Sequence, residues 1–435
     1  MRDILLTLFI FGTIPYIFSK PYIGVLVWSW LGYMNPHRLT WGFAYSMPFT
    51  QVIALATLLS VLFSKEKKTF PVTPITVVLI LFLIYISIST IFAIYPDRAF
   101  TELIRVYKIQ TVIFLTLILF NNKARIHQLI WVIAASIGFY GLKGGLFAFL
   151  TGGDFRVWGP AGSFIEGNNE LGLALIVILP LFFYLKDTLT KKWHKRLLLI
   201  CIGLITISIL STYSRGAFLA LAIISFYLWV KMPNKLPTAI AGIILAVVVL
   251  GFMPDKFFNR MDTIETYQED ASAMGRINAW TLAINIANDR FFAGGAQHWS
   301  SKTFQMYAPV PDDVHDAHSI YFEILGEQGY MGLFLFLLLY ILAFKKAGWI
   351  IKKTRDIEDL KWCNSLIRMI QVSLIGYASG GAFLGLAYWD LPYHLVAIVV
   401  VVGRIVENYK PQKKQTTIHA ESKIIKSPKK KWTWE

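Results

Sequence analysis

The sequence DDVHDAH, residues 312–318, ends the one long polar stretch of this chain, which begins at residue 254 and separates two hydrophobic regions. It places His318 just before the next apolar segment. A histidine at a membrane boundary can change its charge near neutral pH and is therefore a candidate for acid–base chemistry. The stretch predicts a loop above a bilayer that holds most of an active site.

The composition of the whole chain indicates a polytopic membrane protein. Of its 435 residues, 56% are hydrophobic, 15% aromatic and only 16% charged, which is too apolar for a soluble domain. The formal net charge of +16 does not indicate nucleic-acid binding, because many Lys and Arg residues lie in short loops between apolar runs. Cys201 and Cys363 predict neither a disulfide nor a metal site. Met1-Arg2-Asp3, followed by an apolar run, predicts a retained membrane anchor.

Apolar runs predict about twelve transmembrane helices with both termini in the cytoplasm. Residues 4–34 count as one broken crossing, because Ser19-Lys20-Pro21 interrupts them. The other predicted spans are 48–63, 72–94, 107–120, 127–150, 170–185, 197–213, 215–231, 238–253, 320–344, 366–388 and 391–407. The basic loops then fall on one side, which is cytoplasmic by the positive-inside rule; they are 191–196, 231–235 and 345–355.

The predicted fold is all-α, with a large periplasmic loop between the ninth and tenth spans. The chain divides into transmembrane helices (1–253), a periplasmic catalytic loop (254–318), C-terminal transmembrane helices (319–408) and a basic cytoplasmic tail (409–435). Two further segments are predicted on the same face as the loop: residues 151–169 and the tight turn at 211–215.

Three arginines are candidates for binding an anion. Arg215 lies in a tight boundary turn on the side that is poor in clustered cations, where a resident anion would account for it; snorkelling to the surface is the alternative. Arg276 begins a helix of apolar spacing, where a guanidinium and free backbone N–H groups can bind phosphate; a solvated charge is the alternative. Arg290, at the other end of that helix, binds the same anion or offsets the helix dipole.

His318 is the candidate general base, because a neutral imidazole can take a proton from a sugar hydroxyl, and Asp316 or Glu323 could orient it. A metal site is the rival interpretation, since His315 and His318 lie three residues apart with several aspartates beside them. A histidine with a purely structural role at the interface is the third. Residues 158–172, rich in Gly and Asn, either line a sugar pocket through Trp158 and Asn169 or form a turn and helix cap.

Together these residues resemble the O-antigen ligase and polymerase superfamily. The resemblance rests on Ser214-Arg215-Gly216, on Gly275-Arg276 followed by Trp280, and on His318-Ser319 with Gly329 before an apolar span. Residues 34–43, MNPHRLTWGF, resemble the branch of O-glycosylation ligases associated with exosortase systems. Ser319 and Arg290 depart from the family pattern, which often has Asn after the His and Pro near position 290.

The resemblance implies a GT-C-like fold in the bacterial inner membrane and an inverting, metal-independent glycosyltransferase without a cofactor. A glycan would pass from undecaprenyl pyrophosphate to a sugar hydroxyl of the lipid A core on the periplasmic face. His318 would deprotonate that hydroxyl, and Arg215, Arg276 and Arg290 would bind the pyrophosphate. Trp158, Asn169 and Tyr213 would contact the acceptor or glycan.

Alternatives to this assignment remain open at the level of the sequence. An O-antigen polymerase or an O-linked protein oligosaccharyltransferase would use the same chemistry on another acceptor. A lipid-linked glycan flippase belongs to a different class, but such transporters show internal symmetry and several mid-span charges, which the sequence lacks. The expected partners are the lipid-linked donor, the lipid A-core acceptor and membrane lipids, with no nucleic acid and no predicted oligomeric state.

Overall fold

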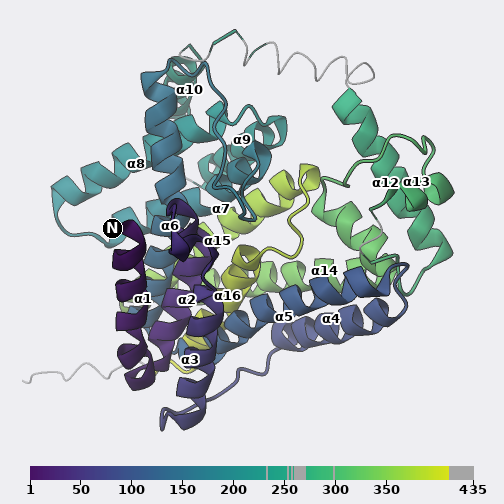
Figure 1. Cartoon of the computed structure of the whole chain (residues 1–435). Coiled ribbons are helices and arrows are strands. Elements are labelled where there is room, and N and C mark those ends of the chain that lie inside the picture. The colour runs from purple at the N-terminus through teal and green to yellow at the C-terminus, as the bar shows by residue number, and fades with distance from the viewer. Residues whose placement is uncertain (232–233, 252–253, 256–257, 259–270, 297–298, 411–435) are drawn as a thin grey trace, which may run out of the picture.

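The computed structural model describes residues 1–231, 234–251, 254–255, 258, 271–296 and 299–410 (Figure 1). These residues form helices joined by turns and loops, and no β-strand occurs among them. The first α-helices are α1 (Arg2–Ser19), α2 (Pro21–Met34), α3 (Phe49–Phe63), α4 (Pro74–Ile91), α5 (Pro96–Leu119), α6 (Lys123–Leu150), α7 (Asn168–Thr188) and α8 (Lys192–Ser211). They are followed by α9 (Arg215–Lys231), α10 (Lys235–Gly251), α12 (Ala271–Asp289), α13 (Ser301–Tyr307), α14 (Ile320–Lys353), α15 (Lys361–Gly380) and α16 (Asp390–Glu407). Short 3₁₀ helices are η1 (Pro36–Leu39), η2 (Phe43–Ser46), η3 (Glu358–Leu360) and η4 (Gly381–Phe383).

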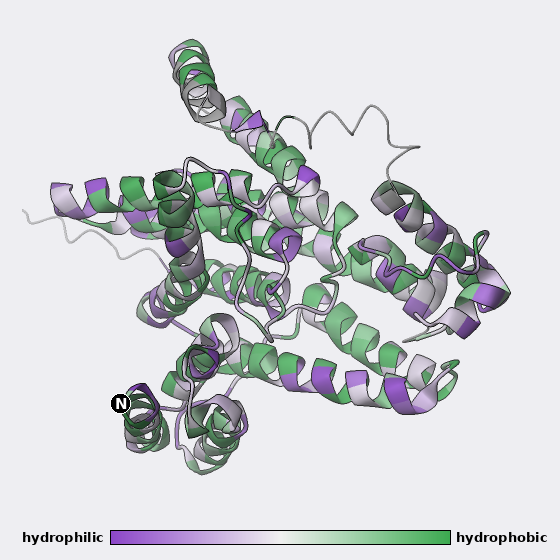
Figure 2. Ribbon diagram, turned by 45° about the horizontal axis from the view of Figure 1, so that its top comes forward, coloured by the Kyte–Doolittle hydropathy of each residue, from purple (hydrophilic) through white to green (hydrophobic). Residues whose placement is uncertain are grey.

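Within the described residues, six helices are long and apolar enough to cross a bilayer: α1, α4, α6, α7, α8 and α14. Figure 2 shows hydrophobic residues along most of the helices and more hydrophilic ones around α12 and α13. The chain is therefore a multi-pass membrane protein with an all-helical fold. The predicted count of twelve spans is not confirmed, because the other described helices are shorter or more polar.

The first 34 residues form a helical hairpin, which corrects the prediction of one broken crossing. Lys20 has an extended conformation (φ −142°, ψ 94°) and links α1 to α2, which pack against each other. Asp3 at the start of α1 accepts hydrogen bonds from the N–H groups of Gly42 and Ala44, both at 3.0 Å, so the two ends of the hairpin meet. Pro21 interrupts the hydropathy pattern but is favourable at the first position of a helix, where no N–H partner is needed.

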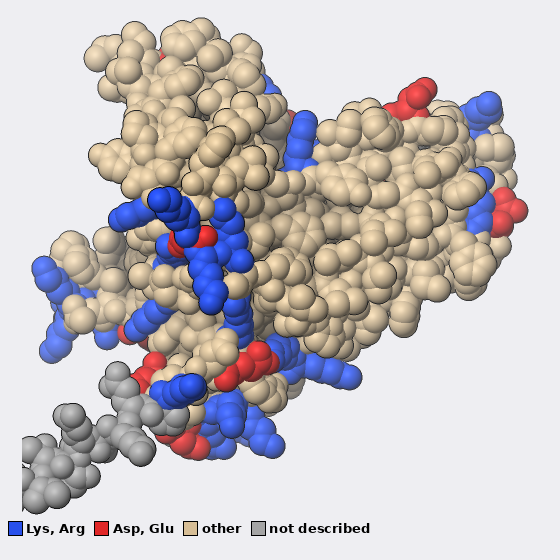
Figure 3. Space-filling view, turned by 90° about the horizontal axis from the view of Figure 1, so that it is seen from below, with Lys and Arg blue, Asp and Glu red and all other residues tan. Residues whose placement is uncertain are grey.

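Basic loops from distant parts of the sequence gather at one end of the helices, which we call the basic-loop end. Arg125 at the start of α6 pairs with Glu66 in the α3–α4 loop, and Arg404 near the end of α16 donates to the Thr69 carbonyl at 2.9 Å. Other contacts at this end are Lys346–Glu407, Tyr409–Asp359, His127–Tyr184 and His127–Trp362. Figure 3 shows Lys and Arg side chains clustered on one part of the surface.

The opposite end of the helices, which we call the site end, joins the segments that the sequence predicted to share a face. The N–H of Val157 donates to the Ser211 carbonyl at 2.9 Å, and the Asn168 side chain donates to the Thr212 carbonyl at 2.8 Å. The loop before α7 therefore packs on the turn between α8 and α9.

The start of α1 also lies at the site end. Tyr140, in the second half of α6, donates a hydrogen bond to the Met34 carbonyl, and a Cβ added at Gly162 would lie 3.5 Å from Nε of Arg38. Asp3 is hydrogen-bonded to Gly42 and Ala44, close to this contact, whereas α16 ends at the basic-loop end. The first and last helices of the described residues therefore begin and end, respectively, at opposite ends of the molecule. The predicted placement of the chain's first residues on the same side as the end of α16 is therefore not supported, and residues 411–435 lie outside the described residues.

The described part of the 254–318 loop forms a small cap, α12 and α13, with its own apolar core of Ala279, Leu282, Ile286 and Phe304. The Asn278 amide donates to the carbonyls of Val310 (2.8 Å) and Asp313 (2.9 Å), which fixes the loop after α13 onto α12. The rest of this loop, and nearly all of the predicted tail 409–435, lie outside the described residues.

The cap is attached to α14 at a break in that helix. Gly329 inside that helix has φ 66° and ψ −172°, a conformation that glycine adopts readily. The N–H of Gly295 donates to the Gly326 carbonyl at 2.7 Å, and the N–H of Tyr330 donates to the Phe291 carbonyl at 3.2 Å. The segment that follows α12 is thereby held at the break in α14, close to where α14 begins.

Candidate active site

His318 lies at the site end, two residues before α14, with a backbone conformation that is unusual for its residue type. Its φ is +43°, in the left-handed region that non-glycine residues rarely occupy. Such conformations concentrate at functional sites, where the surrounding structure has to hold them. The next residue, Ser319, is buried and forms the N-cap of α14. The imidazole is therefore presented from a constrained position at a helix start, as the sequence predicted.

The start of α12 lies against the loop that ends in His318. A Cβ added at Gly275 would lie 2.3 Å from Cδ2 of His315, so a larger residue there would require the imidazole to shift. Trp280 donates from its indole N–H to the Ala317 carbonyl at 2.7 Å, and its ring stacks on Phe322 with centroids 4.8 Å apart. These contacts place the second and third turns of α12 against residues on both sides of His318, namely His315, Ala317 and Phe322.

Arg276 is half-buried in the second turn of α12 and acts electrostatically on His318; since α12 includes residues from Ala271 on, the prediction that Arg276 begins this helix is wrong. Burial lowers the pKa of His318 from its ordinary value of 6.5, and the positive charges of Arg276 and His315 lower it further. The negative charges of Asp316 and Glu170 act in the opposite direction. The net shift is downward, so the imidazole is neutral at physiological pH, which is the form that can accept a proton.

Arg215 begins α9 at the same end of the molecule and is linked to His318 through the segment after α15. A Cβ added at Gly216 would lie 3.0 Å from Cβ of Phe383, and one added at Gly385 would lie 3.9 Å from Cα of His318. Residues 383–385 thus separate the α9 turn from the α14 start. Arg276 is a direct electrostatic neighbour of the imidazole, whereas Arg215 lies at the start of α9, across this segment from His318.

Tyr213 has a structural role in the turn before Arg215. It adopts φ +54°, and its buried hydroxyl donates to the Gly153 carbonyl at 2.5 Å. Asn169 lies half-buried in the first turn of α7, next to the residue that caps the α8–α9 turn. Trp158 is 58% exposed, with the Arg156 guanidinium 5.8 Å from its ring. Their predicted contacts with a glycan stay predictions.

Arg290 lies at the far end of α12 from Arg276. A rise of about 1.5 Å per residue places the two about 20 Å apart along the helix. The Arg290 guanidinium donates to the Phe92 carbonyl and, through Nε, to the Gly294 carbonyl at 2.8 Å. These bonds tie the end of α12 to the α4–α5 loop. The predicted role in pyrophosphate binding stays a prediction.

A polar cavity of about 320 Å³ adjoins His318. Of the residues that line it, only Glu323 was considered in the sequence analysis. It is lined by carboxylates from three helices, Glu102 on α5, Glu170 on α7 and Glu323 on α14, and by Arg105 and Tyr388. The sequence signal that could have found it is the charge-rich start of α5. The predicted span of 107–120 left out that part of the helix, which begins at Pro96.

His315 and the neighbouring aspartates, which the alternative prediction of a metal site uses, also lie at the site end. Nε2 of His315 lies 2.7 Å from Oδ1 of Asp313, and the His315 ring packs on Gly275. Across the described ranges, no group of three or more His, Cys, Asp or Glu residues is arranged to hold a metal ion.

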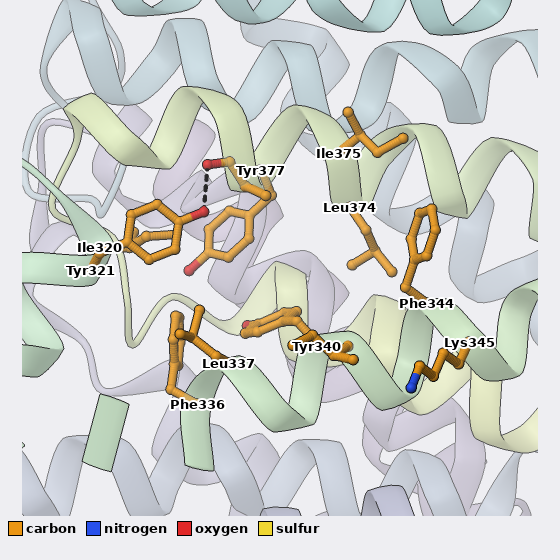
Figure 4. A pocket seen from close by; sticks show the side chains of 12 residues that line it. Ile320, Tyr321, Phe336, Leu337, Tyr340, Phe344, Lys345, Leu374, Ile375 and Tyr377 are labelled. Atoms are coloured by element: carbon orange, nitrogen blue, oxygen red, sulfur yellow. Dashed lines mark hydrogen bonds between the residues drawn. The ribbon is translucent and has the colours of Figure 1, made fainter. Parts of the chain in front are cut away.

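An apolar cavity of about 390 Å³ runs between α14 and α15 and begins beside Ile320, two residues from His318 (Figure 4). Figure 4 shows Tyr340 and Phe344 on the α14 side facing Leu374 and Ile375 on the α15 side. Tyr321 donates to the Ala378 carbonyl at 2.7 Å and bridges the two helices at the site end. A hydrocarbon chain with its head at the site end would fit the character of this lining.

Comparison with known families connects this geometry to a function. Residues 197–337, from the start of α8 to the second half of α14, match a family described as O-antigen ligase. Residues 1–190 match a family of unknown function. Comparison with curated protein sequences gives no match. The O-antigen ligase match contains Arg215, Arg276, Arg290 and His318, so the resemblance drawn from the motifs is confirmed. The part of the chain that carries these residues, 197–337, is therefore similar to the O-antigen ligase family.

Proposed function

We propose that this protein is an inverting O-antigen ligase. A hydroxyl of a lipid A-core sugar attacks the anomeric carbon of a glycan linked to undecaprenyl pyrophosphate. The new glycosidic C–O bond forms as the bond to the pyrophosphate oxygen breaks. The hydroxyl proton passes to His318, and undecaprenyl pyrophosphate leaves with the electron pair of the broken bond.

The observation that carries this proposal is the pairing of a neutral imidazole with a guanidinium at one end of the helices. His318 supplies the base, and Arg276 supplies a fixed positive charge within electrostatic range of it. Positive charge held in place before the reaction stabilises the negative charge that grows on the departing pyrophosphate. The same charge keeps the base deprotonated, so one guanidinium serves both requirements.

Arg215 would complete the diphosphate site from the α9 side. It stands at a helix N-terminus, where backbone N–H groups and the helix dipole favour anions. Its half-buried side chain is on the same face as His318, across residues 383–385. Two phosphates joined by one oxygen are long enough to be contacted from both sides by extended arginines.

The cavity between α14 and α15 is the proposed place of the polyprenyl tail. It starts at Ile320 beside the catalytic end, its lining is almost wholly apolar, and it extends to Lys345 toward the basic-loop end. A tail lying there would leave its pyrophosphate head near His318.

Orientation follows from the charges of the loops. Since the positive-inside rule places clustered Lys and Arg in the cytoplasm, the basic-loop end faces the cytoplasm and the site end faces the periplasm. This places the reaction where a lipid-linked glycan and a membrane-anchored acceptor can meet. This orientation also agrees with a location in the inner membrane.

Arg290 would act by positioning rather than by binding the diphosphate. Its guanidinium is bonded to two backbone carbonyls about one helix length from Arg276. These bonds hold the cap against the α4–α5 loop and so keep the other end of α12, with Arg276, against the His318 loop.

The test is ligation by the purified protein in liposomes, with an undecaprenyl-pyrophosphate glycan as donor. Lipid A core, a growing glycan and a Ser/Thr peptide are offered separately as acceptors. We expect glycosylated lipid A core, no loss of transfer in excess chelator, and loss of transfer in His318→Ala. Transfer only to glycan or only to peptide would instead identify a polymerase or a protein oligosaccharyltransferase. Movement of the donor across the bilayer without transfer would identify a flippase.

A further inference from the structure

The polar cavity beside His318 has the chemistry of a sugar site. Its carboxylates can accept hydrogen bonds from hydroxyls, and charge-assisted bonds of this kind are stronger than neutral ones. Phe164 and Tyr388 add ring surfaces to the lining. Its volume of about 320 Å³ is at the small end of ligand pockets, which suits one sugar ring better than an oligosaccharide.

The cavity wall is rich in carboxyl groups, opposite in charge to the Arg276 guanidinium, and it lies close to His318. A Cβ added at Gly385 would lie 3.3 Å from Oε2 of Glu323 and 3.9 Å from Cα of His318, so the cavity wall reaches the catalytic residue. Glu170, also in the wall, raises the pKa of His318, whereas Arg276 lowers it. The imidazole is therefore within electrostatic range of both the Arg276 guanidinium and a carboxylate of the cavity wall.

An inverting displacement needs separate places for the acceptor and for the leaving group. The attacking hydroxyl and the leaving group occupy opposite faces of the anomeric carbon, and the base contacts the attacking hydroxyl. A pyrophosphate is attracted to the Arg276 guanidinium and repelled by the carboxylates. The cavity is therefore on the acceptor's side of the reaction.

The electrostatic balance of the cavity also selects the acceptor. Arg105 lies 3.5 Å from Glu102 and 3.9 Å from the Phe164 ring centroid, and it offsets one of the carboxylates. Even with Glu323 counted as neutral, the carboxylates Glu102 and Glu170 outnumber this guanidinium. An acceptor ring that carried a phosphate or carboxylate would place like charges together at close range, which is costly.

We propose that this cavity, lined by Glu102, Glu170 and Glu323, binds the acceptor sugar and selects a ring without anionic groups, neutral or amine-bearing. This inference rests on the proposed function for the role of the bound sugar. The binding preference itself can be measured without any transfer.

The experiment measures binding of small probes to the full-length protein in nanodiscs, without donor, by ligand-observed NMR. The probes are methyl β-glucopyranoside, its 6-phosphate, and the corresponding 2-amino-2-deoxy glucoside. We expect the neutral and amino sugars to bind and the phosphate to bind at least about tenfold more weakly. Glu102→Gln should narrow the gap, because it removes one of the repelling charges from a side chain that is 38% exposed and so tolerates the change.

Glu358→Gln is the matched control, because Glu358 is 79% exposed and lies in η3 at the basic-loop end. It should leave all three affinities at wild-type values. Equal binding of the phosphate and the neutral sugar by the wild type would overturn the inference, as would an unchanged preference in both Glu102→Gln and Glu170→Gln. Failure of the wild type to transfer glycan to any acceptor would instead contradict the proposed function, whatever the probes show.

Discussion

The two ends of this molecule both carry charge, but they carry it differently. At the basic-loop end, cations are numerous and many are exposed or paired, as Arg125 is with Glu66. At the site end, three cationic or titratable side chains are each held at a defined backbone position: Arg215 at a helix start, Arg276 beside the closely packed Gly275, and His318 in a left-handed conformation. The difference teaches that clusters of cations indicate which side of the membrane a loop is on. The position of individual side chains indicates where a reaction can take place.

The largest expected difference between the two ends is the effect of replacing a histidine on the rate of glycan transfer. His318→Ala should lower transfer by about 10²- to 10⁴-fold, because it removes the general base. The measurement is the initial rate of glycan transfer in proteoliposomes. His194→Ala is the matched control, since His194 is at the basic-loop end, where it contacts Trp193; its rate should equal that of the wild type. A His318→Ala enzyme that transfers glycan at a near-normal rate would remove the base hypothesis.

Arg290 distinguishes positioning from direct binding. Arg290→Ala should lower the free energy of unfolding by about 1.5 to 3 kcal/mol, because its two carbonyl contacts involve a charged donor. Thermal unfolding in detergent measures this change. Affinity for undecaprenyl pyrophosphate should stay close to that of the wild type. Unchanged stability with a large loss of affinity would show that Arg290 binds the diphosphate directly, as its sequence position suggested.

The pH dependence of transfer sharpens the role of the site-end charges. Because only neutral His318 can accept a proton, activity should be complete near neutral pH and fall as the pH drops through its lowered pKa, below 6.5. Arg276→Gln removes a charge that lowers this pKa, so the acid limb should move to higher pH. Asp316→Asn removes a charge that raises it, and the limb should move to lower pH. Profiles that overlap in all three proteins would contradict the electrostatic role of these residues.

The smallest effects are expected at the basic-loop end. Arg404→Gln removes two hydrogen bonds to Thr69 at the loop before α4 and should cost at most about 1 to 3 kcal/mol of stability, with the transfer rate unchanged. Thermal unfolding and the transfer assay measure the two quantities. A specific loss of transfer with normal stability would mean that this end also takes part in the reaction.

The same contrast explains how much was predictable from the sequence. The all-helical membrane fold, the clustering of basic loops and the packing of the loop before α7 on the turn at 211–215 follow from hydropathy and charge, which act along the chain. The family followed from motifs around Arg215, Arg276 and His318, each of which is local in sequence.

Features that depend on three-dimensional packing were not predictable in this way. The α1–α2 hairpin was missed because Lys20-Pro21 resembles an interruption, although Pro21 begins a helix. The acidic cavity was missed because Glu102 and Arg105 were assigned to a loop, whereas α5 begins at Pro96 and carries them to α7 and α14. The bend at Gly329 depends on backbone bonds to residues 291–295, which no hydropathy pattern encodes.

The most direct measurement is the affinity of the purified protein for undecaprenyl pyrophosphate in nanodiscs. If Arg215 and Arg276 hold one diphosphate at the site end, Arg215→Gln and Arg276→Gln should each weaken binding at least about tenfold, as expected for loss of a charge-assisted contact. Arg355→Gln, an exposed arginine of the basic-loop end, should bind as the wild type does. Wild-type affinity in both site-end variants would contradict the convergence of these arginines on a single ligand.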